Sequence, residues 1–196
     1  MAVRAEVTRA RILEAAWDLV RARGAPAVTM QEVAAASGVT RQLVYFHFGD
    51  RAGLLIAMTR HHDERSGFRE RVAATRRLAP DEGLEALLRE WLLYIPDILP
   101  VATALQAAAE TSEDAAEAWR DRMDDLREAF RIALARLRRE GRLAPGWSVD
   151  AAADWVWARS HLSGWRQLVG DRDWRPERYA DRSVRSILAE LVLPPA

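Results

Sequence analysis

Cysteine and lysine are both absent from this chain of 196 residues. Without cysteine there can be no disulfide framework, no thiolate metal site and no cysteine nucleophile. The first residues lack the pattern of a signal peptide, because Arg4, Glu6, Arg9 and Arg11 interrupt any apolar run. No window approaches the roughly 20 consecutive apolar residues of a membrane span. These absences favour a cytoplasmic protein without a membrane partner.

Charge is balanced overall but unevenly placed. All 29 basic residues are arginine, and they match 29 carboxylates, so the formal net charge is zero. Residues 1–62 hold eight arginines against five carboxylates, whereas the remainder holds 21 arginines against 24 carboxylates. The N-terminal part is therefore the basic part, which is the sign that suits a polyanionic partner.

The apolar residues recur at helical spacing nearly throughout, and no strand-like alternation, internal repeat or low-complexity tract is visible. The pattern predicts an all-α chain of about nine helices. They are expected at 8–23, 30–36, 40–46, 51 into the seventies, 82–95, 98–110, 112–140, 149–169 and 176–192. Several of these boundaries are set at prolines, because proline costs least at a helix end.

Two short helices joined by a glycine turn are predicted in residues 29–46. Thr29 and Glu32 have the spacing of a capping box, which opens the first of these helices. Gly38 suits the turn because glycine adopts a positive φ at no steric cost. A small residue, Ala34, lies four positions earlier and permits close crossing of the helices. This is the geometry of a helix-turn-helix.

The second short helix carries groups that suit DNA. Thr40 offers a hydroxyl beside the free amides of a helix N-terminus, where a phosphate can bind. Arg41 and Gln42 are expected to point outward, and these side chains pair bidentately with guanine and adenine respectively. The alternative is an ordinary mixture of caps and core positions. For Phe46 and Phe48, whose spacing is that of buried aromatics, we expect core packing.

Residues 8–58 resemble the DNA-binding domain of TetR-family transcriptional regulators. The resemblance is carried by ILEAAWDLVRARG, TMQEVAAASGV, TRQLVYFHF and GDRAGLL, in that order. It implies a helix-turn-helix DNA-binding domain over 1–60 and a C-terminal helical effector-binding and dimerisation domain over 61–196. It also implies a ligand-responsive regulator, with a repressor favoured, that binds a palindromic double-stranded DNA operator as a homodimer. A small hydrophobic or aromatic effector would release it.

The resemblance assigns roles to individual residues. The expected base-reading residues are Arg41, Gln42, Leu43 and Gln31. The expected phosphate contacts are Thr29, Thr40, Tyr45, His47 and Arg51. Leu43 departs from the small polar residue often found there in the family, and it could contact a thymine methyl or merely flank the groove. Arg51 stands where a lysine is usual and keeps the charge. Each has a plainer alternative as a cap, a packed aromatic or a surface histidine.

The C-terminal helices are interpreted as the effector-binding and dimerisation part. Segment 149–169 is apolar on two sides, which predicts a partner subunit in a four-helix bundle. The candidate interface residues are Trp155, Leu162, Trp165, Ile187, Leu188 and Leu191. The candidate pocket residues are Trp91, Tyr94, Thr103, Gln106, Glu110, Trp119, Met123, Trp157 and His161. An ordinary core and bundle seam remains an open alternative for each of these pocket residues.

Two other functions were weighed against a ligand-responsive regulator. One is a constitutive DNA-binding dimer without a small-molecule effector. The other is a helical enzyme, but the sequence has no HExxH or GxSxG motif, and no nucleophile lies at a recognisable spacing from a base. His61 and His62 are adjacent and cannot share a helix face. We therefore expect no enzyme activity, no cofactor and no metal.

Overall fold

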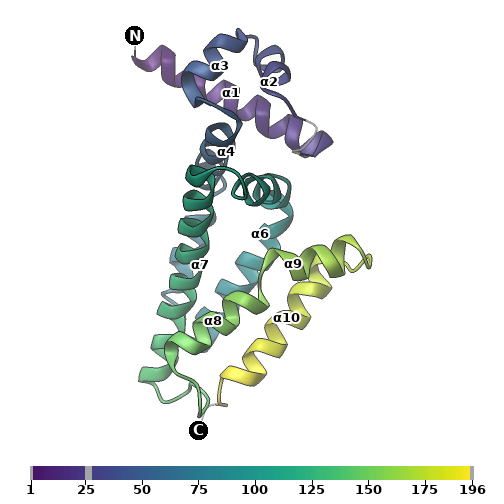
Figure 1. The fold of residues 1–196 in the computed structure, drawn as a ribbon. Helices are drawn as coiled ribbons and strands as arrows, with labels where there is room; N and C mark the ends of the chain where they lie inside the picture. The colour runs from purple at the N-terminus through teal and green to yellow at the C-terminus, as the bar shows by residue number, and fades with distance from the viewer. Residues whose placement is uncertain (1, 25–27, 195–196) are drawn as a thin grey trace. The chain divides into compact units, whose positions relative to one another are not determined.

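A computed structural model describes residues 2–24 and 28–194, with side chains from residue 5 onward. Its α-helices (Figure 1) are α1 (Ala2–Arg23), α2 (Met30–Ser37), α3 (Arg41–Phe48), α4 (Arg51–Arg65), α5 (Phe68–Thr75), α6 (Pro80–Ala108), α7 (Glu113–Arg139), α8 (Val149–Arg159), α9 (Leu162–Trp165) and α10 (Pro176–Leu191). A π-helical turn, Arg166–Gly170, continues α9. Nine helices have at least eight residues, and the β-type pairing in the described ranges is a single bridge, Leu143 to Val192. The predicted all-α fold is confirmed.

Three of the differences from the predicted helix boundaries have an identifiable structural cause. The helix expected from residue 51 into the seventies ends at Arg65, because Gly67 turns the backbone into the left-handed region with φ 67°. The two helices expected at 82–95 and 98–110 are one helix, α6, which continues through Pro96 and Pro100. Its apolar positions are buried on both sides of these prolines, so packing outweighs their local cost.

The helix expected over 149–169 ends after Arg159. Ser160 is fully buried, and its hydroxyl donates back to the Val156 carbonyl at 2.7 Å. The Ser160 carbonyl in turn accepts the indole N–H of Trp91 at 2.8 Å, so a side chain of α6 satisfies the end of α8. His161 then caps α9. The prediction of one long helix that is apolar on two faces is therefore wrong.

The chain divides by its contacts into two units. The first comprises Met1–Ser66 and Asp97–Asp121, and the second comprises Gly67–Pro96 and Arg122–Ala196. The core of the first unit joins α1 to α4 with the C-terminal part of α6 and the first turn of α7; its members include Ile12, Val33, Val44, Met58, Leu105 and Ala115. Residues 97–121 therefore pack with the helix-turn-helix. The functional boundary at residue 60 stays a prediction.

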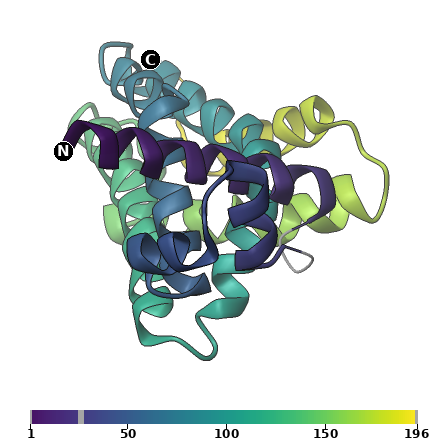
Figure 2. The ribbon, with the colours of Figure 1, turned by 90° about the horizontal axis from the view of Figure 1, so that it is seen from above.

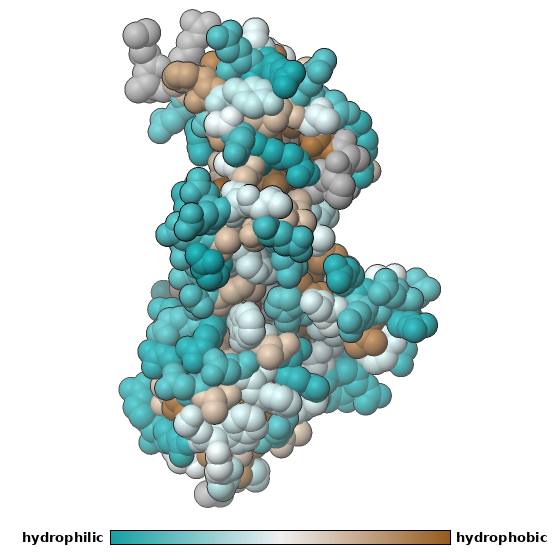
Figure 3. Space-filling model, in the orientation of Figure 1, coloured by the Kyte–Doolittle hydropathy of each residue, from teal (hydrophilic) through white to brown (hydrophobic). Residues whose placement is uncertain are grey.

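Contrary to the expectation from the sequence, helix α6 is long and apolar enough to cross a membrane by length and composition alone. Half of its most apolar window is buried inside the protein, however, which is also what a core helix of a water-exposed protein shows. On the face seen in Figure 3, hydrophobic residues form small patches among hydrophilic ones. We therefore interpret α6 as a core helix.

Candidate nucleic-acid interface

Helices α2 and α3 form a helix-turn-helix with a left-handed turn. Gly38 has φ 65° and ψ 35°, and its N–H donates to the Ala35 carbonyl at 3.2 Å. The following N–H, of Val39, donates to the Ala34 carbonyl at 3.0 Å. These bonds satisfy the end of α2 and reverse the chain within two residues. Figure 2 shows α1 to α3 at the near side of the first unit.

The junction of α3 with α4 is equally tight. Gly49 has φ 72°, and Asp50 caps α4 by accepting the Gly53 N–H at 2.8 Å. A Cβ at Gly53 would overlap the carbonyl oxygen of Phe48, so only glycine fits beside the end of α3. The position of α3 relative to α4 is therefore fixed by backbone contact.

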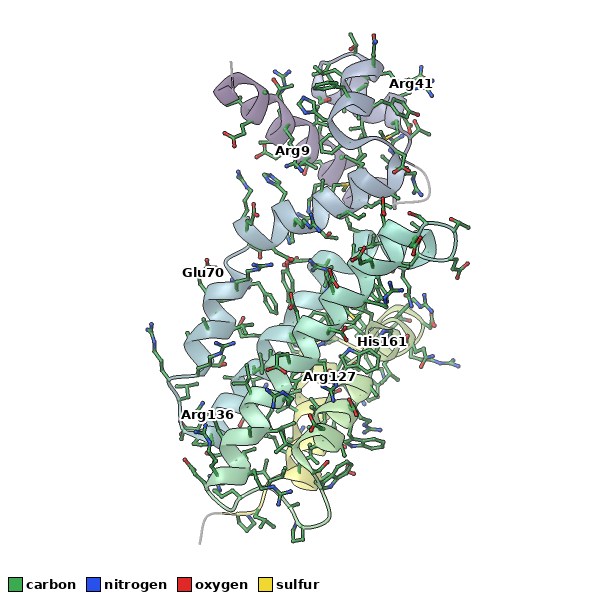
Figure 4. All side chains as sticks on the ribbon, turned by 60° about the vertical axis from the view of Figure 1, so that its left-hand side comes forward. Arg9, Arg41, Glu70, Arg127, Arg136 and His161 are labelled. Carbon is green, nitrogen blue, oxygen red and sulfur yellow. The ribbon has the colours of Figure 1, made fainter. Side chains whose placement is uncertain are left out.

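The outward face of α3 carries the expected base-reading groups. Arg41 and Gln42 are exposed in its first turn, and Figure 4 shows Arg41 projecting outward from the helix. Arg41 Nη2 donates to the Tyr45 hydroxyl at 3.1 Å, which is one helical turn away. Leu43 is half-buried and Gln31 on α2 is exposed. Arg41, Gln42 and Gln31 thus have side chains that a DNA groove could reach.

Thr29 and Thr40 differ in whether the hydroxyl hydrogen is available to a phosphate. The Thr29 hydroxyl oxygen accepts the Glu32 N–H at 3.3 Å, and the Thr29 backbone N–H donates to the Glu32 carboxylate at 2.9 Å, which completes the predicted capping box. The Thr29 hydroxyl also donates its hydrogen to that carboxylate, at 2.9 Å. Thr40 accepts the Leu43 N–H at 3.2 Å through its oxygen. Its cap does not use the hydroxyl hydrogen, so Thr40 can cap α3 and donate to a phosphate at once.

Glu32 is the carboxylate of α2, and its charge is compensated within the fold. The backbone N–H of Thr29 lowers the pKa of Glu32, with further contributions from the Thr29 hydroxyl and from Arg23. Arg23 Nη1 lies 2.9 Å from its Oε1. The negative charge is thereby bound to the capping box and an arginine, which limits its repulsion of phosphates.

Phe46 is the residue that the sequence interpretation misplaced. It was expected in the core, but 81% of its surface is exposed, whereas Phe48 is buried at 8%. Two positions apart on a helix, the side chains point in different directions. The ring of His47 lies edge-on to Phe46 at 5.5 Å between centroids, and His47 is half-buried. An exposed aromatic on a recognition helix is a further candidate for contact with DNA.

Arg9 is a further candidate for the interface, and the sequence did not single it out. It lies exposed on α1, and its Cζ is 5.4 Å from the centroid of the Phe48 ring. This cation–π contact holds a positive charge beside the C-terminal end of α3. Arg51, at the start of α4, is also exposed. The interface thus combines charge from three helices with a row of side chains on α3.

Known proteins resemble this chain most clearly over the same helices. The sequence model described as "Bacterial regulatory proteins, tetR family" matches residues 12–58. The HTH-type transcriptional regulator TtgW of Pseudomonas putida is 35% identical over 108 residues, which cover 54% of this chain and 71% of TtgW. The chain belongs to the TetR family. It is a DNA-binding transcriptional regulator and not an enzyme, as the family and its relatives show.

Other TetR-family and regulator proteins extend the likeness to the C-terminal helices. The HTH-type transcriptional repressor AcnR of Corynebacterium efficiens is 27% identical over 139 residues, which cover 69% of each chain. A transcriptional regulator from Saccharomonospora viridis, solved in complex with choline, has a TM-score of 0.82 at 20% identity and covers 96% of this chain and 100% of that one. At this identity the likeness shows the fold alone.

The candidate pocket residues of this TetR-family regulator fall into both units. Thr103, Gln106, Glu110 and Trp119 belong to the first unit, and Trp91, Tyr94, Met123, Trp157 and His161 to the second. Gln106 and Glu110 are exposed. In the second unit, Trp91 and Tyr94 are buried, and the ring of Phe68 stacks on Tyr94 at 4.2 Å. Phe68 was not anticipated, because nothing in its local sequence indicates a partner in α6.

The candidate interface residues differ in how far their own chain buries them. Leu162, Ile187 and Leu191 are buried within the second unit, so their own chain already covers the surface that they were expected to offer. Trp165 and Leu188 are half-buried, and Trp155 is 37% exposed. A partner subunit on this face would therefore contact Trp155, Trp165 and Leu188.

Proposed function

We propose that this TetR-family protein is a ligand-responsive repressor that binds a palindromic operator as a homodimer. The observation that carries the DNA-binding part is the exposed row on α3: Thr40, Arg41, Gln42 and Tyr45 offer donors at the outer face of a helix that is held by two backbone turns. Arg41 and Gln42 would read base edges, and Thr40, Tyr45, His47 and Arg51 would contact phosphates.

The face formed by α8 and α10 supports a homodimer. The two helices lie side by side (Figure 1) and are tied at their exposed side, where Trp155 Nε1 donates to Glu190 Oε2 at 3.0 Å. Three exposed alanines lie near this bond, Ala151 and Ala158 on α8 and Ala189 on α10, beside Arg159, whose Cζ is 5.7 Å from the Trp155 ring centroid. Small residues allow the helices of a second copy to approach closely, as a four-helix bundle requires. A two-fold dimer would present two copies of α3 to two half-sites.

Two half-buried tryptophans with buried indole nitrogens support a ligand-binding role for the second unit. Trp157 Nε1 and Trp165 Nε1 are buried and lack a hydrogen-bond acceptor among the described residues. A buried N–H without an acceptor is costly, and an acceptor atom on a bound molecule would relieve that cost. The effector would bind more tightly to a conformation in which the distance between the two recognition helices does not match the operator. Affinity for the operator would fall because the effector favours that conformation.

Selection of bound sites from random DNA duplexes tests the DNA-binding part. We expect a palindromic site whose half-sites are spaced by about one helical turn or a multiple of it, with affinity that falls steeply as salt rises. A binding that is insensitive to salt and selects no palindrome would contradict the proposal. A screen for small molecules that release the protein from this site then separates a ligand-responsive repressor from a constitutive DNA-binding dimer.

The dimer is tested by Ala189→Arg, which sets a large charged side chain on the proposed interface. We expect the sedimenting mass to halve and operator binding to weaken. Ala73→Arg is the matched control, because Ala73 is equally exposed but lies on α5. If both variants sediment like the unaltered protein, the α8–α10 face is not the interface.

A further inference from the structure

A cavity of about 520 Å³ opens beside the N-terminal half of α10 in the second unit. Its lining includes three arginines: Arg159 at the end of α8, and Arg182 and Arg185 on α10. No carboxylate lines it among the residues that the structure describes. The cavity lies outside the helix-turn-helix and includes none of the residues that the sequence assigned to the effector pocket.

At short range these arginines bind neutral partners. Arg159 Nη2 donates to the hydroxyl of Ser186 at 3.3 Å, and Arg185 Nε donates to the backbone carbonyl of Asp181 at 3.2 Å. The Asp181 carboxylate pairs with Arg89, whose Nη1 lies 2.6 Å from Oδ1, and the charge of Arg185 also lowers the pKa of Asp181, so this acid offsets part of the charge of Arg185. Because three guanidinium groups and no carboxylate of the described residues line the cavity, its lining is net positive.

Another part of the lining is apolar and is held in place by a backbone hydrogen bond. Trp174 and Leu168 form it, and the Trp174 N–H donates to the Leu168 carbonyl at 2.9 Å. Leu168 lies in the π-helical turn, a rare geometry that often occurs at functional sites. The Cζ of Arg178 lies 4.2 Å from the Trp174 ring centroid and braces that ring.

Tyr179 adds a hydroxyl to the lining, and a glycine makes room for it. A Cβ at Gly164 would lie 2.9 Å from the Tyr179 hydroxyl oxygen, so a larger residue would displace that oxygen. Burial raises the pKa of Tyr179 above its usual value, so its hydroxyl stays protonated near neutral pH and remains a donor. Ser183, which also lines the cavity, hydrogen-bonds to the Tyr179 hydroxyl and holds it in place.

We propose that this cavity binds an organic anion. Its carboxylate, sulfonate or phosphate-like head group would be held by Arg159, Arg182 and Arg185, and its aromatic or aliphatic body would pack on Leu168 and Trp174. Planar guanidinium groups suit such head groups because they offer paired donors and keep their charge. The volume is that of a site for a drug-sized molecule.

Arg159 and Ser186 lie both in the cavity lining and on the α8–α10 face. An anion bound in the cavity would therefore change how two subunits associate through that face. That coupling rests on the proposed homodimer, whereas anion binding does not. A carboxylate from a second copy is the competing occupant, and the experiment below treats it as a separate outcome.

The test compares two fluorescent probes that share one aromatic body: 8-anilinonaphthalene-1-sulfonate, an anion, and N-phenyl-1-naphthylamine, its neutral counterpart. We expect the full-length protein to bind the sulfonate about tenfold more tightly than the neutral probe, because the head group adds charge-assisted hydrogen bonds. Raising the salt from about 0.1 M to about 0.5 M should weaken binding of the sulfonate alone.

Arg182→Gln together with Arg185→Gln should remove the preference for the sulfonate and leave the affinity for the neutral probe unchanged. Arg139→Gln is the control, since Arg139 is exposed on α7 and lies outside the cavity. Equal losses for both probes, or no loss, would overturn the proposal. So would a halved sedimenting mass in the double variant, which would assign the arginines to the subunit interface. Operator binding without the probe, measured in parallel, reports separately on the DNA-binding function.

Discussion

Arg41 lies against Tyr45 on the recognition helix: Nη2 is 3.1 Å from the phenolic oxygen, and Cζ is 5.2 Å from the ring centroid. The two side chains are one turn apart, so the contact is local to α3 and needs no other element. It restrains a long side chain before DNA arrives, which reduces the entropy that binding must overcome.

This contact predicts a coupled effect of Tyr45→Phe. The variant keeps the ring and loses both the acceptor for Arg41 and a donor for phosphate, so operator affinity should fall about fivefold, or about 1 kcal/mol. The part of the loss that comes from the phosphate contact should be equal for all DNA sequences, whereas the part that acts through Arg41 should be largest on the sequences that Arg41 reads. Measured alongside Arg41→Ala and the double variant, the losses should fall short of additivity. Strict additivity would show that the contact does not persist on DNA.

The pair Phe46 and Phe48 predicts a clean separation of binding from stability. Phe46→Ala should leave the free energy of unfolding within about 0.5 kcal/mol, because the ring is exposed, yet weaken operator binding. Phe48→Ala should cost about 3–5 kcal/mol of stability, because that ring is buried. Urea unfolding and fluorescence anisotropy on operator DNA measure the two quantities. Unchanged operator affinity in Phe46→Ala would remove Phe46 from the interface.

Gln42 is predicted to read a base rather than a phosphate. Gln42→Ala should relax the preference at one base pair in each half-site by about 1–3 kcal/mol. Arg51→Ala serves as the comparison, since it should weaken binding to every sequence alike and reduce the slope of affinity against salt. Binding of each variant to a panel of single-base operator variants distinguishes the two. A uniform loss for Gln42→Ala would reassign Gln42 to the backbone.

Gly53 predicts a stability effect at the junction of α3 and α4. A Cβ there meets the Phe48 carbonyl, which is backbone and cannot rotate away. Gly53→Ala should therefore destabilise the protein by about 1–3 kcal/mol, despite the higher helix propensity of alanine. Ala52→Gly, one position earlier in the same turn, gives the cost of a propensity change together with the loss of a half-buried methyl group. If Gly53→Ala is as stable as the unaltered protein or more stable, the close approach is relaxed in solution.

Local signals explain what could be predicted from the sequence. Three predicted features each involve residues no more than four positions apart, and all three occur: the capping box of Thr29 and Glu32, the turn at Gly38 and the cap at Thr40. These motifs also carried the resemblance to the TetR family. The helix-turn-helix was therefore readable without knowledge of what packs around it.

The remaining features depend on partners far away in the sequence. The end of α8 is set by Trp91, which is 69 residues from Ser160, and no local pattern reveals that bond. Helix α6 passes two prolines because its apolar positions are buried on either side of them. Aromatic spacing likewise could not tell Phe46 from Phe48, since the direction of each ring depends on where α3 meets the core.

His161 predicts a loss of stability in mild acid. Burial lowers the pKa of His161, and the charge of Arg166 lowers it further. Its Nδ1 also accepts the Ser163 N–H at 3.3 Å, a bond that needs an unprotonated nitrogen. The unfolded chain therefore takes up a proton near pH 6.5 that the folded chain resists, and stability falls as the pH drops below about 6.5.

His161→Asn keeps an acceptor for the cap but does not titrate, so its free energy of unfolding should decline less between about pH 7.5 and about pH 5.5. Some decline should remain, because burial also lowers the pKa of His61. Urea titrations across this range measure the slopes, and identical slopes for the two proteins would show that His161 titrates normally in the fold.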